Sequence, residues 1–178
     1  MINKGYLTAK TDKASDEVFT PDYAVKPILK YIKPNSTVWC PFDKPDSEFV
    51  KQITGNNCSV IYSHIDYEGG NFFEYAPADH QYDCIISNPP FSIKDDILKR
   101  LYELNKPYAM LLPLPSLQGQ KRFDYIKDCE ALIFDKRINY FKDMETKEIQ
   151  KGISFASIYL CRNFLPEKLI FEKLEVTK

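Results

Sequence analysis

Residues 82–91 have the sequence Tyr-Asp-Cys-Ile-Ile-Ser-Asn-Pro-Pro-Phe, in which a short apolar run ends at two prolines. An apolar run bounded by a turn signal is typical of a strand that is buried on both faces of a sheet. Pro89 and Pro90 each lack a backbone N–H group and have a fixed φ angle, and Asn88 is held extended because it precedes a proline. The sequence therefore predicts a buried strand that ends in a rigid projection at the edge of a sheet.

Similar apolar runs occur on both sides of this stretch, and segments with helical periodicity lie between them. Strands are predicted at 37–40, 59–63, 82–87, 107–112, 131–134 and 154–161, and helices over 21–33, 47–53 and 93–104. The first helix is expected to have Thr20 as its N-cap and Pro21 as its first residue. Alternating strands and helices predict an α/β fold, with a parallel sheet that helices cover on both faces.

The segments that follow the predicted strands are the expected place for a binding site. In open α/β sheets, ligands bind outside the carboxyl ends of the strands. Four segments of this chain reach that edge, namely residues 40–47, 63–72, 88–92 and 113–119.

Length and composition indicate an ordinary globular protein. The chain has 178 residues, of which 44% are hydrophobic and 28% are charged, which suits one domain with a real core. Residues 1–17 are polar and lack helical periodicity, so they are expected to form a flexible arm ahead of a single domain over 18–178. No apolar run approaches the roughly 18 residues of a membrane span, and the N-terminus does not resemble a signal peptide.

The net charge and the cysteine pattern narrow the possible classes of protein further. The net charge of -1 and the pI of about 6.1 give no overall basic character, so any phosphate contact is left to a local patch such as Arg122, Lys136, Arg137 and Lys142. The five cysteines form no CxxC pair and there are two histidines, so no metal site is expected. Cysteines inside apolar runs indicate a reducing, cytoplasmic location.

The rigid projection at residues 88–91 has a specific chemical use. The side-chain carbonyl of Asn88 and the backbone carbonyl of Pro89 are two acceptors with little freedom, and Phe91 adds a planar surface beside them. Two fixed acceptors can grip an aromatic or amide NH2 group, draw its nitrogen toward tetrahedral geometry and localise its lone pair. The nitrogen can then attack a methyl sulfonium in line, through orientation and electrostatic stabilisation without a strong base.

On these residues the chain resembles the class I, Rossmann-like S-adenosylmethionine-dependent methyltransferases with an (Asn/Asp/Ser)-Pro-Pro-(Tyr/Phe/Trp) motif. It is most similar to the small phage-encoded adenine-N6 DNA methyltransferases, over about residues 16–163. The resemblance implies a mostly parallel sheet with an antiparallel C-terminal strand. It also implies S-adenosylmethionine as the cofactor and nucleic acid, in particular DNA, as the partner; the oligomeric state stays open.

The resemblance also implies roles for individual residues. Phe19, Thr20 and Pro21 match a segment that lines the methionine end of the cofactor. Asn71 and Phe72 match a pair whose polar side chain touches the cofactor's adenine while the ring packs on it. Phe155 lies in a late segment that resembles the one whose ring, together with Phe91, holds the target base.

The loop after the first predicted strand departs from the family pattern. In the family that strand ends in an acidic residue and a proline, followed by a glycine-rich turn. Here Cys40 replaces the acid, Pro41 matches the proline, and no glycine follows before Ser47. Either Asp43 or Asp46 faces the cofactor's ammonium group instead, or the loop is filled and cofactor binding is weak or lost.

Beyond that loop, Asp66 follows the second predicted strand and is expected to accept hydrogen bonds from both ribose hydroxyls.

Three functions are compatible with these features. The leading hypothesis is an adenine-N6 methyltransferase that acts on DNA. A second is a catalytically inactive binding module on a methyltransferase fold, which the missing glycine turn favours. A third keeps catalysis but changes the acceptor to RNA, to a cytosine amine or to a protein amide, because the same two acceptors suit each of these groups.

Overall fold

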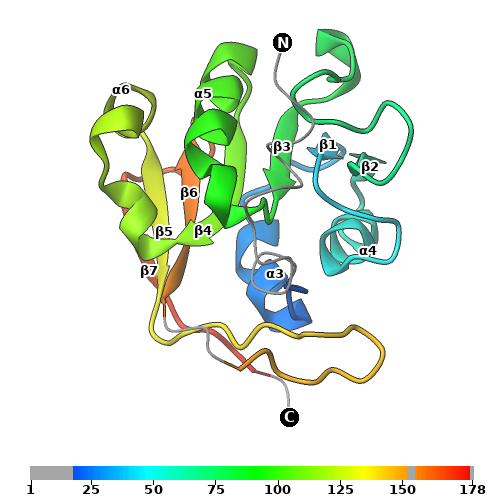
Figure 1. The fold of residues 1–178 in the computed structure, drawn as a ribbon, viewed down its shortest axis with the longest axis vertical. Helices are drawn as coiled ribbons and strands as arrows, with labels where there is room; N and C mark the ends of the chain where they lie inside the picture. The colour runs from blue at the N-terminus through cyan, green and yellow to red at the C-terminus, as the bar shows by residue number, and fades with distance from the viewer. Residues whose placement is uncertain (1–17, 152–154, 177–178) are drawn as a thin grey trace.

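The computed structural model describes residues 18–151 and 155–176 (Figure 1), so the arm expected over 1–17 lies outside the described residues. The described strands form one sheet of seven, in the order β2-β1-β3-β4-β6-β5-β7. Their bounds are β1 Thr37–Cys40, β2 Ser59–Tyr62, β3 Cys84–Ser87, β4 Tyr108–Pro113, β5 Glu130–Phe134, β6 Ser157–Arg162 and β7 Leu169–Glu172.

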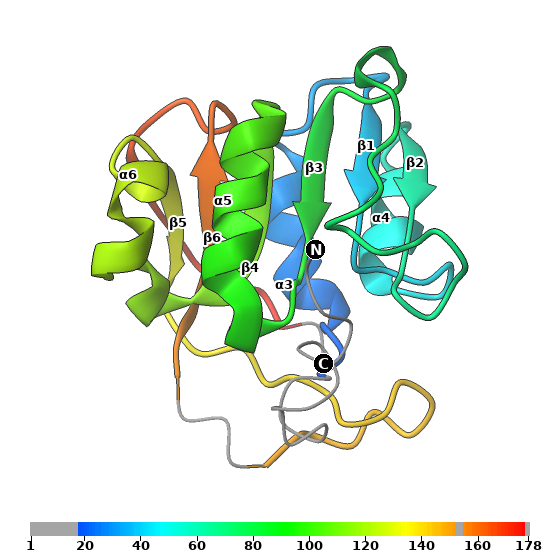
Figure 2. The ribbon, with the colours of Figure 1, turned by 45° about the horizontal axis from the view of Figure 1, so that its top comes forward.

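Strand β6 is antiparallel to both of its neighbours, β4 and β5, and every other pair of neighbouring strands is parallel. Figure 2 shows the arrowheads of β1, β2 and β3 pointing the same way, and that of β6 pointing the opposite way. The predicted fold class, a mostly parallel α/β sheet with a reversed strand near the C-terminus, is confirmed.

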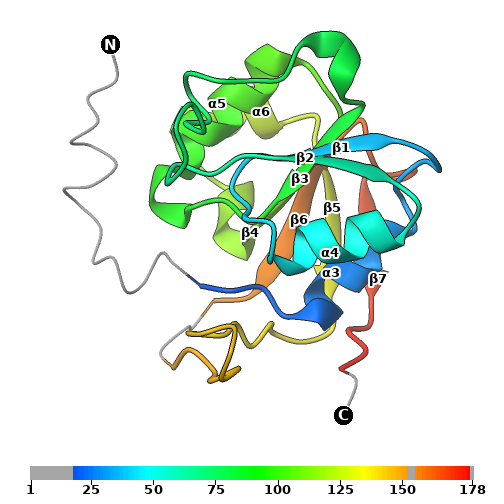
Figure 3. The ribbon, with the colours of Figure 1, turned by 90° about the vertical axis from the view of Figure 1, so that its right-hand side faces the viewer.

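Helices cover both faces of this sheet (Figure 3). Helices α3 (Asp22–Leu29) and α4 (Glu48–Gly55) pack together on one face, while α5 (Lys94–Leu104) and α6 (Phe123–Ile126) lie on the other. Short 3-10 turns follow several strands: η1 Asp79–Gln81, η2 Phe91–Ile93, η3 Leu114–Leu117 and η4 Gln120–Arg122. No described helix combines the length and the apolar character that a membrane span requires.

Burial explains why the central strands read as continuous apolar runs. All four residues of β3 are buried, and β4 and β6 are buried along most of their length. Each of these strands has sheet neighbours on both edges and helices on both faces, so neither side chains nor backbone meet water. Trp39, Tyr108, Tyr140 and Tyr159 are among the largest fully buried side chains of the core.

Several predicted elements differ from the observed ones, and helix α3, for example, ends at Leu29 and not at residue 33. Helix α3 begins at Asp22 with Pro21 as its N-cap, so the expectation that Thr20 caps a helix starting at Pro21 was wrong by one residue. Strand β7 was not predicted, because Leu169 and Phe171 are exposed at the sheet edge and the strand has no continuous apolar run. Helix α6 is four residues long, too short to show a helical period.

The order of the strands places a crevice beside β3. From β1 the chain passes outward to β2, and it then returns to β3 on the other side of β1. The loops after β1 and β3 therefore leave the sheet in opposite directions from adjacent strands. In doubly wound sheets this switch point is where a ligand-binding crevice opens, at the carboxyl ends of the strands.

Candidate functional site

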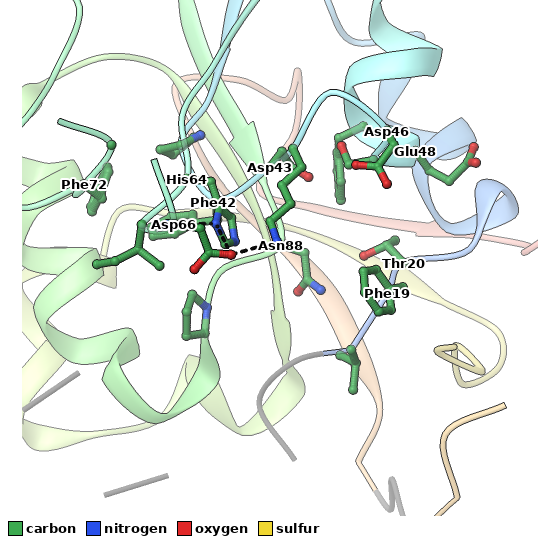
Figure 4. Close-up of a pocket in the computed structure, with 18 of the residues that line it drawn as sticks. Phe19, Thr20, Phe42, Asp43, Asp46, Glu48, His64, Asp66, Phe72 and Asn88 are labelled. Atoms are coloured by element: carbon green, nitrogen blue, oxygen red, sulfur yellow. Dashed lines mark hydrogen bonds and ion pairs between the residues drawn. The ribbon is translucent and has the colours of Figure 1, made fainter. Parts of the chain in front are cut away.

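A cavity of about 240 Å³ lies at this switch point (Figure 4). Its lining comes from residues 18–20, from the loop 41–49 after β1, from 64–66 and 70–73 after β2, from Asn88, Pro90 and Ile93 after β3, and from Met144. Pockets that enclose drug-sized ligands usually measure roughly 300–1,000 Å³. A ligand of that size would therefore fill this cavity and extend through its mouth.

Asn88 follows directly on β3, and its side chain points toward the cavity (Figure 4). Its Oδ1 atom is buried and accepts no hydrogen bond from any residue in the described part of the chain. A buried acceptor without a partner costs roughly 1–3 kcal/mol, so such atoms are rare and call for an explanation. An N–H donor carried by a ligand would satisfy this one once the Asn88 amide turns its oxygen into the cavity.

The structure separates the residues of the Asn-Pro-Pro-Phe motif. Asn88 and Pro90 line the cavity, whereas Pro89 and Phe91 are absent from the lining that residues 18–151 and 155–176 provide. The ring of Phe91 is buried and meets the ring of Phe155 edge to face, with centroids 5.3 Å apart and planes at 88°. Tyr140 contacts Phe91 from another side, at 6.4 Å. The two rings expected to hold a target base are therefore packed on each other.

Asp43 provides a buried carboxylate in the loop after β1. It lines the cavity, is 6% exposed and accepts a hydrogen bond from the hydroxyl of Ser87. Burial raises the pKa of the Asp43 carboxyl to about 6, and hydrogen bonds from Ser87 and Ser47 oppose this rise. No described residue forms an ion pair with Asp43, so the site contains a buried anion that lacks a cation.

The other two residues of this loop that were expected to bind the cofactor, Cys40 and Pro41, differ in their position relative to the cavity. Pro41 lines the cavity, while Cys40 is fully buried at the end of β1, where burial raises the pKa of its thiol. The N-terminus of α4 follows, with the Ser47 hydroxyl accepting from the backbone N–H of Val50 at 3.2 Å.

The mouth of the cavity is bridged by an ion pair that the sequence did not suggest. The ammonium of Lys44, after β1, lies 2.7 Å from a carboxylate oxygen of Asp66, after β2. Nδ1 of His64 accepts a hydrogen bond from the backbone N–H of Asp66 at 3.2 Å and lies 3.3 Å from a carboxylate oxygen of the same residue. Asp66 thus lines the cavity (Figure 4), and its carboxylate is shared with the ammonium of Lys44.

One wall of the cavity is aromatic. Phe72 is buried and packs against Phe42, with ring centroids 4.8 Å apart, and against Trp39 at 5.6 Å. The Asn71 side-chain carbonyl accepts from the backbone N–H of Phe73 at 3.1 Å, which fixes the turn that presents the Phe72 ring. Phe42 was not among the residues expected from sequence, although its place between Pro41 and Asp43 was a usable signal.

A glycine is indispensable in the loop after β2. A Cβ atom on Gly70 would lie 2.0 Å from the backbone oxygen of His64, so only glycine lets these two parts of the loop approach. Gly69 adds a positive φ of 72°. Both glycines therefore shape the loop after β2, which lines one side of the cavity.

The segment before α3 closes the cavity from another side. Phe19 and Thr20 line it, while Pro21 is the N-cap of α3 and lies outside the lining contributed by the described residues. The backbones of Phe19 and Phe141 exchange two hydrogen bonds of 2.9 Å, which fixes this segment against the long connection between β5 and β6. Figure 1 shows that connection, coloured yellow to orange, extending beyond α3.

Two further expectations concern metals and basic residues. Within the ranges that the structure describes, no group of three or more His, Cys, Asp or Glu side chains is placed to hold a metal ion. Arg122, a candidate phosphate contact, donates to Asp95 on α5 and to the backbone oxygen of Gln118. This arginine therefore fastens the loop after β4 to α5.

Comparisons with known proteins do not assign the chain to a family. No protein-family model matches the chain, and no curated protein matches it. One solved structure that the chain resembles is that of a predicted O-methyltransferase, protein Atu636 from Agrobacterium tumefaciens, with a TM-score of 0.36 and 9% sequence identity. The match covers 77% of this chain and 65% of that one.

Proposed function

We propose that this chain is an S-adenosylmethionine-dependent methyltransferase whose acceptor is the N6 amino group of adenine in DNA. The observation that carries the proposal is the buried, unpartnered Oδ1 of Asn88 beside the cavity at the switch point of the sheet. An amino group is the natural partner of that atom, because it brings two N–H donors and a nitrogen that can accept a methyl group.

The lining of the cavity fits the proposed cofactor at its chemically distinct parts. Asp43 offers a buried carboxylate that lacks a cation, which suits the ammonium group of a methionine moiety. The aromatic wall of Phe42 and Phe72 suits a flat base, and the carboxylate of Asp66 can accept hydrogen bonds from a diol. When bound, S-adenosylmethionine supplies an electrophilic methyl group on a sulfonium.

The residues after β3 would then activate the acceptor. Asn88 Oδ1 and the backbone oxygen of Pro89 accept the two N–H bonds of the amine, and the pair of prolines holds both oxygens in place. These bonds localise the nitrogen lone pair and aim it into the cavity. Because the amine loses its extra proton only after the methyl group has moved, orientation and electrostatics suffice and no strong base is required.

The acceptor itself must reach this position from outside. Phe91 and Phe155 pack edge to face at 5.3 Å, so a base cannot lie between them without a change of ring orientation. A base within a duplex would also have to leave the stack, at a cost of a few kcal/mol. We therefore expect single-stranded DNA to be a better acceptor than duplex DNA of the same sequence.

The direct test is incubation of the full chain with isotopically labelled S-adenosylmethionine and DNA, followed by mass spectrometry of the nucleosides. N6-methyladenine is the expected product. Asn88→Ala is expected to lower the rate on the order of 10²–10³-fold, as for the loss of one oxyanion-hole donor. Asn88→Asp is the matched control, because it retains an acceptor oxygen of similar reach and should keep measurable activity.

The remaining outcomes assign the chain to other functions. Labelled N4-methylcytosine, methylated RNA or a methylated glutamine would keep the chemistry and replace the acceptor. Saturable binding of S-adenosylhomocysteine with no transfer to any acceptor would indicate a binding module that has retained the cofactor site. The absence of both binding and transfer would remove the proposal.

A further inference from the structure

Ser87 is an unusual residue for its position. It is the last residue of β3, it is fully buried, and it follows Cys84, Ile85 and Ile86 in a strand whose other side chains are apolar. A hydroxyl in such a place is unfavourable unless it is hydrogen-bonded. Its partner is the carboxyl of Asp43, which lies 44 residues earlier in the chain, in the loop after β1.

Asp43 is itself held firmly from the backbone. Its N–H donates to the backbone oxygen of Ser63 at 3.2 Å, and the N–H of Ser63 donates in turn to the backbone oxygen of Cys40 at 3.1 Å. The indole N–H of Trp39 reaches the hydroxyl of Ser63 at 3.1 Å. The carboxyl of Asp43 is therefore a fixed point to which the end of β3 is attached through Ser87.

The attachment bears directly on Asn88, because Asn88 is bonded to Ser87 and carries the unpartnered oxygen at the cavity. We propose that Asp43 and Ser87 act as a positioning pair, through which the charge on Asp43 controls how Asn88 presents its side-chain carbonyl to the cavity. The coupling is a property of the free protein; only its consequence for catalysis rests on the proposed methyl transfer.

The physical basis is the strength of one hydrogen bond. A hydroxyl donates more strongly to a carboxylate than to a neutral carboxyl, by roughly a factor of two. When Asp43 is ionised, Ser87 is held and the backbone leading to Asn88 is fixed. When Asp43 takes up a proton, the bond weakens and the turn after β3 can relax.

Because of its surroundings, the Asp43 carboxyl gains or loses this proton near neutral pH. Burial raises the pKa of its carboxyl to about 6. The other titratable groups that act on it from the packed elements are the thiol of Cys40 and the phenol of Tyr159, and burial raises the pKa of both, so they stay neutral. Of the titratable residues that share the cavity, Asp46 and Glu48 are acidic, Lys44 is paired with Asp66, and His64 lies beside Asp66.

Nuclear magnetic resonance on the free, full-length protein tests the coupling without any reaction. The side-chain NH2 signals of Asn88 are followed in ¹⁵N-labelled protein between about pH 5 and 8, a range chosen to span the ionisation of Asp43. In the unmodified protein we expect them to titrate with a midpoint near 6. Asp43→Asn removes the titrating group and Ser87→Ala removes the connection, so each should leave the Asn88 signals flat.

Asp46→Asn is the matched control, because Asp46 lines the same cavity three positions from Asp43 and forms no hydrogen bond with Ser87 within the described residues. It should leave the titration in place. Asn88 signals that do not respond to pH in the unmodified protein would overturn the inference, whether or not any variant folds. Titration that persists in a folded Ser87→Ala protein would also overturn it, since Asp43 would then act through its field alone.

A methyl-transfer assay is a second measurement, and it distinguishes this inference from the proposed function. With an active enzyme, Ser87→Ala should lower kcat by up to about 10²-fold, as misplacement of a reacting group by about 1 Å does, and leave cofactor affinity little changed. If the Asn88 signals titrate with Asp43 but no methyl transfer is detected, the proposed function is refuted and the positioning pair is upheld. If methyl transfer is detected but the Asn88 signals do not change with pH, the proposed function is upheld and the positioning pair is refuted.

Discussion

Lys44 and Asp66 join the loops after β1 and β2 across the mouth of the cavity, with nitrogen and oxygen 2.7 Å apart. The two side chains are 43% and 58% exposed, so water and salt screen the pair. Exposed ion pairs contribute at most about 1 kcal/mol to stability. The pair therefore has more influence on what enters the cavity than on the fold.

The exposed Lys44–Asp66 pair can be removed with little effect on the fold. Lys44→Met should change the free energy of unfolding by less than about 1 kcal/mol, as measured by urea denaturation. The same substitution should raise the affinity for S-adenosylhomocysteine, because a ribose diol would no longer share Asp66 with an ammonium. Asp66→Asn should lower that affinity, and equal affinities of both variants and the unmodified protein would exclude a role for Asp66 in binding.

The second prediction concerns the cost of the unpartnered acceptor. Asn88→Ala removes a buried oxygen that has no donor in the described part of the chain, so it should leave the melting temperature unchanged or raise it. A variant that loses activity while keeping its stability would identify Asn88 as a residue retained for function. A fall of several degrees in thermal unfolding would show instead that the side chain supports the fold.

The third prediction compares two glycines. Gly70→Ala should destabilise the protein by more than about 2 kcal/mol, because the added Cβ would lie 2.0 Å from the His64 backbone oxygen and the loop must shift. Gly55→Ala, at the end of α4, is the matched control, since nothing lies within 4 Å of its Cβ position. It should be neutral or stabilising by up to about 1 kcal/mol. Equal effects at the two positions in denaturant titrations would contradict this assignment.

The fourth prediction is a pH dependence of stability. Because burial raises the pKa of Asp43 from 3.8 to about 6, the folded state binds this proton more tightly than the unfolded state does. Stability contributed by the neutral carboxyl is therefore lost as pH rises from about 4 to 6, by on the order of 3 kcal/mol.

Asp43→Asn removes that loss. The difference in unfolding free energy between the variant and the unmodified protein should thus grow in favour of the variant across this interval and stay constant above it. Urea denaturation at a series of pH values measures the difference. A difference that does not vary with pH would mean that Asp43 titrates alike in both states.

The cofactor loop shows how far a motif can be read without a structure. The resemblance marked residues 40–47 as a departure from the family pattern, because no glycine lies between Pro41 and Ser47. In the structure the loop still borders an open cavity, and the glycine that permits a close backbone approach is Gly70, after the next strand. Gly70 brings its backbone close to that of His64, which is a contact within the loop after β2 that the motif did not predict.

Local patterns in the sequence determined the sheet strands β1 to β6, the helices α3 to α5 and the rigid turn at Asn88. Continuous burial, helical spacing and proline geometry act between residues that are near one another in the chain, so they leave a readable trace. The placement of Phe91 against Phe155, the Lys44–Asp66 pair and the attachment of Ser87 to Asp43 were decided only by the tertiary structure. Each of these joins loops that are far apart in the chain, and the free energy of such a contact depends on where the folded sheet brings the loops together.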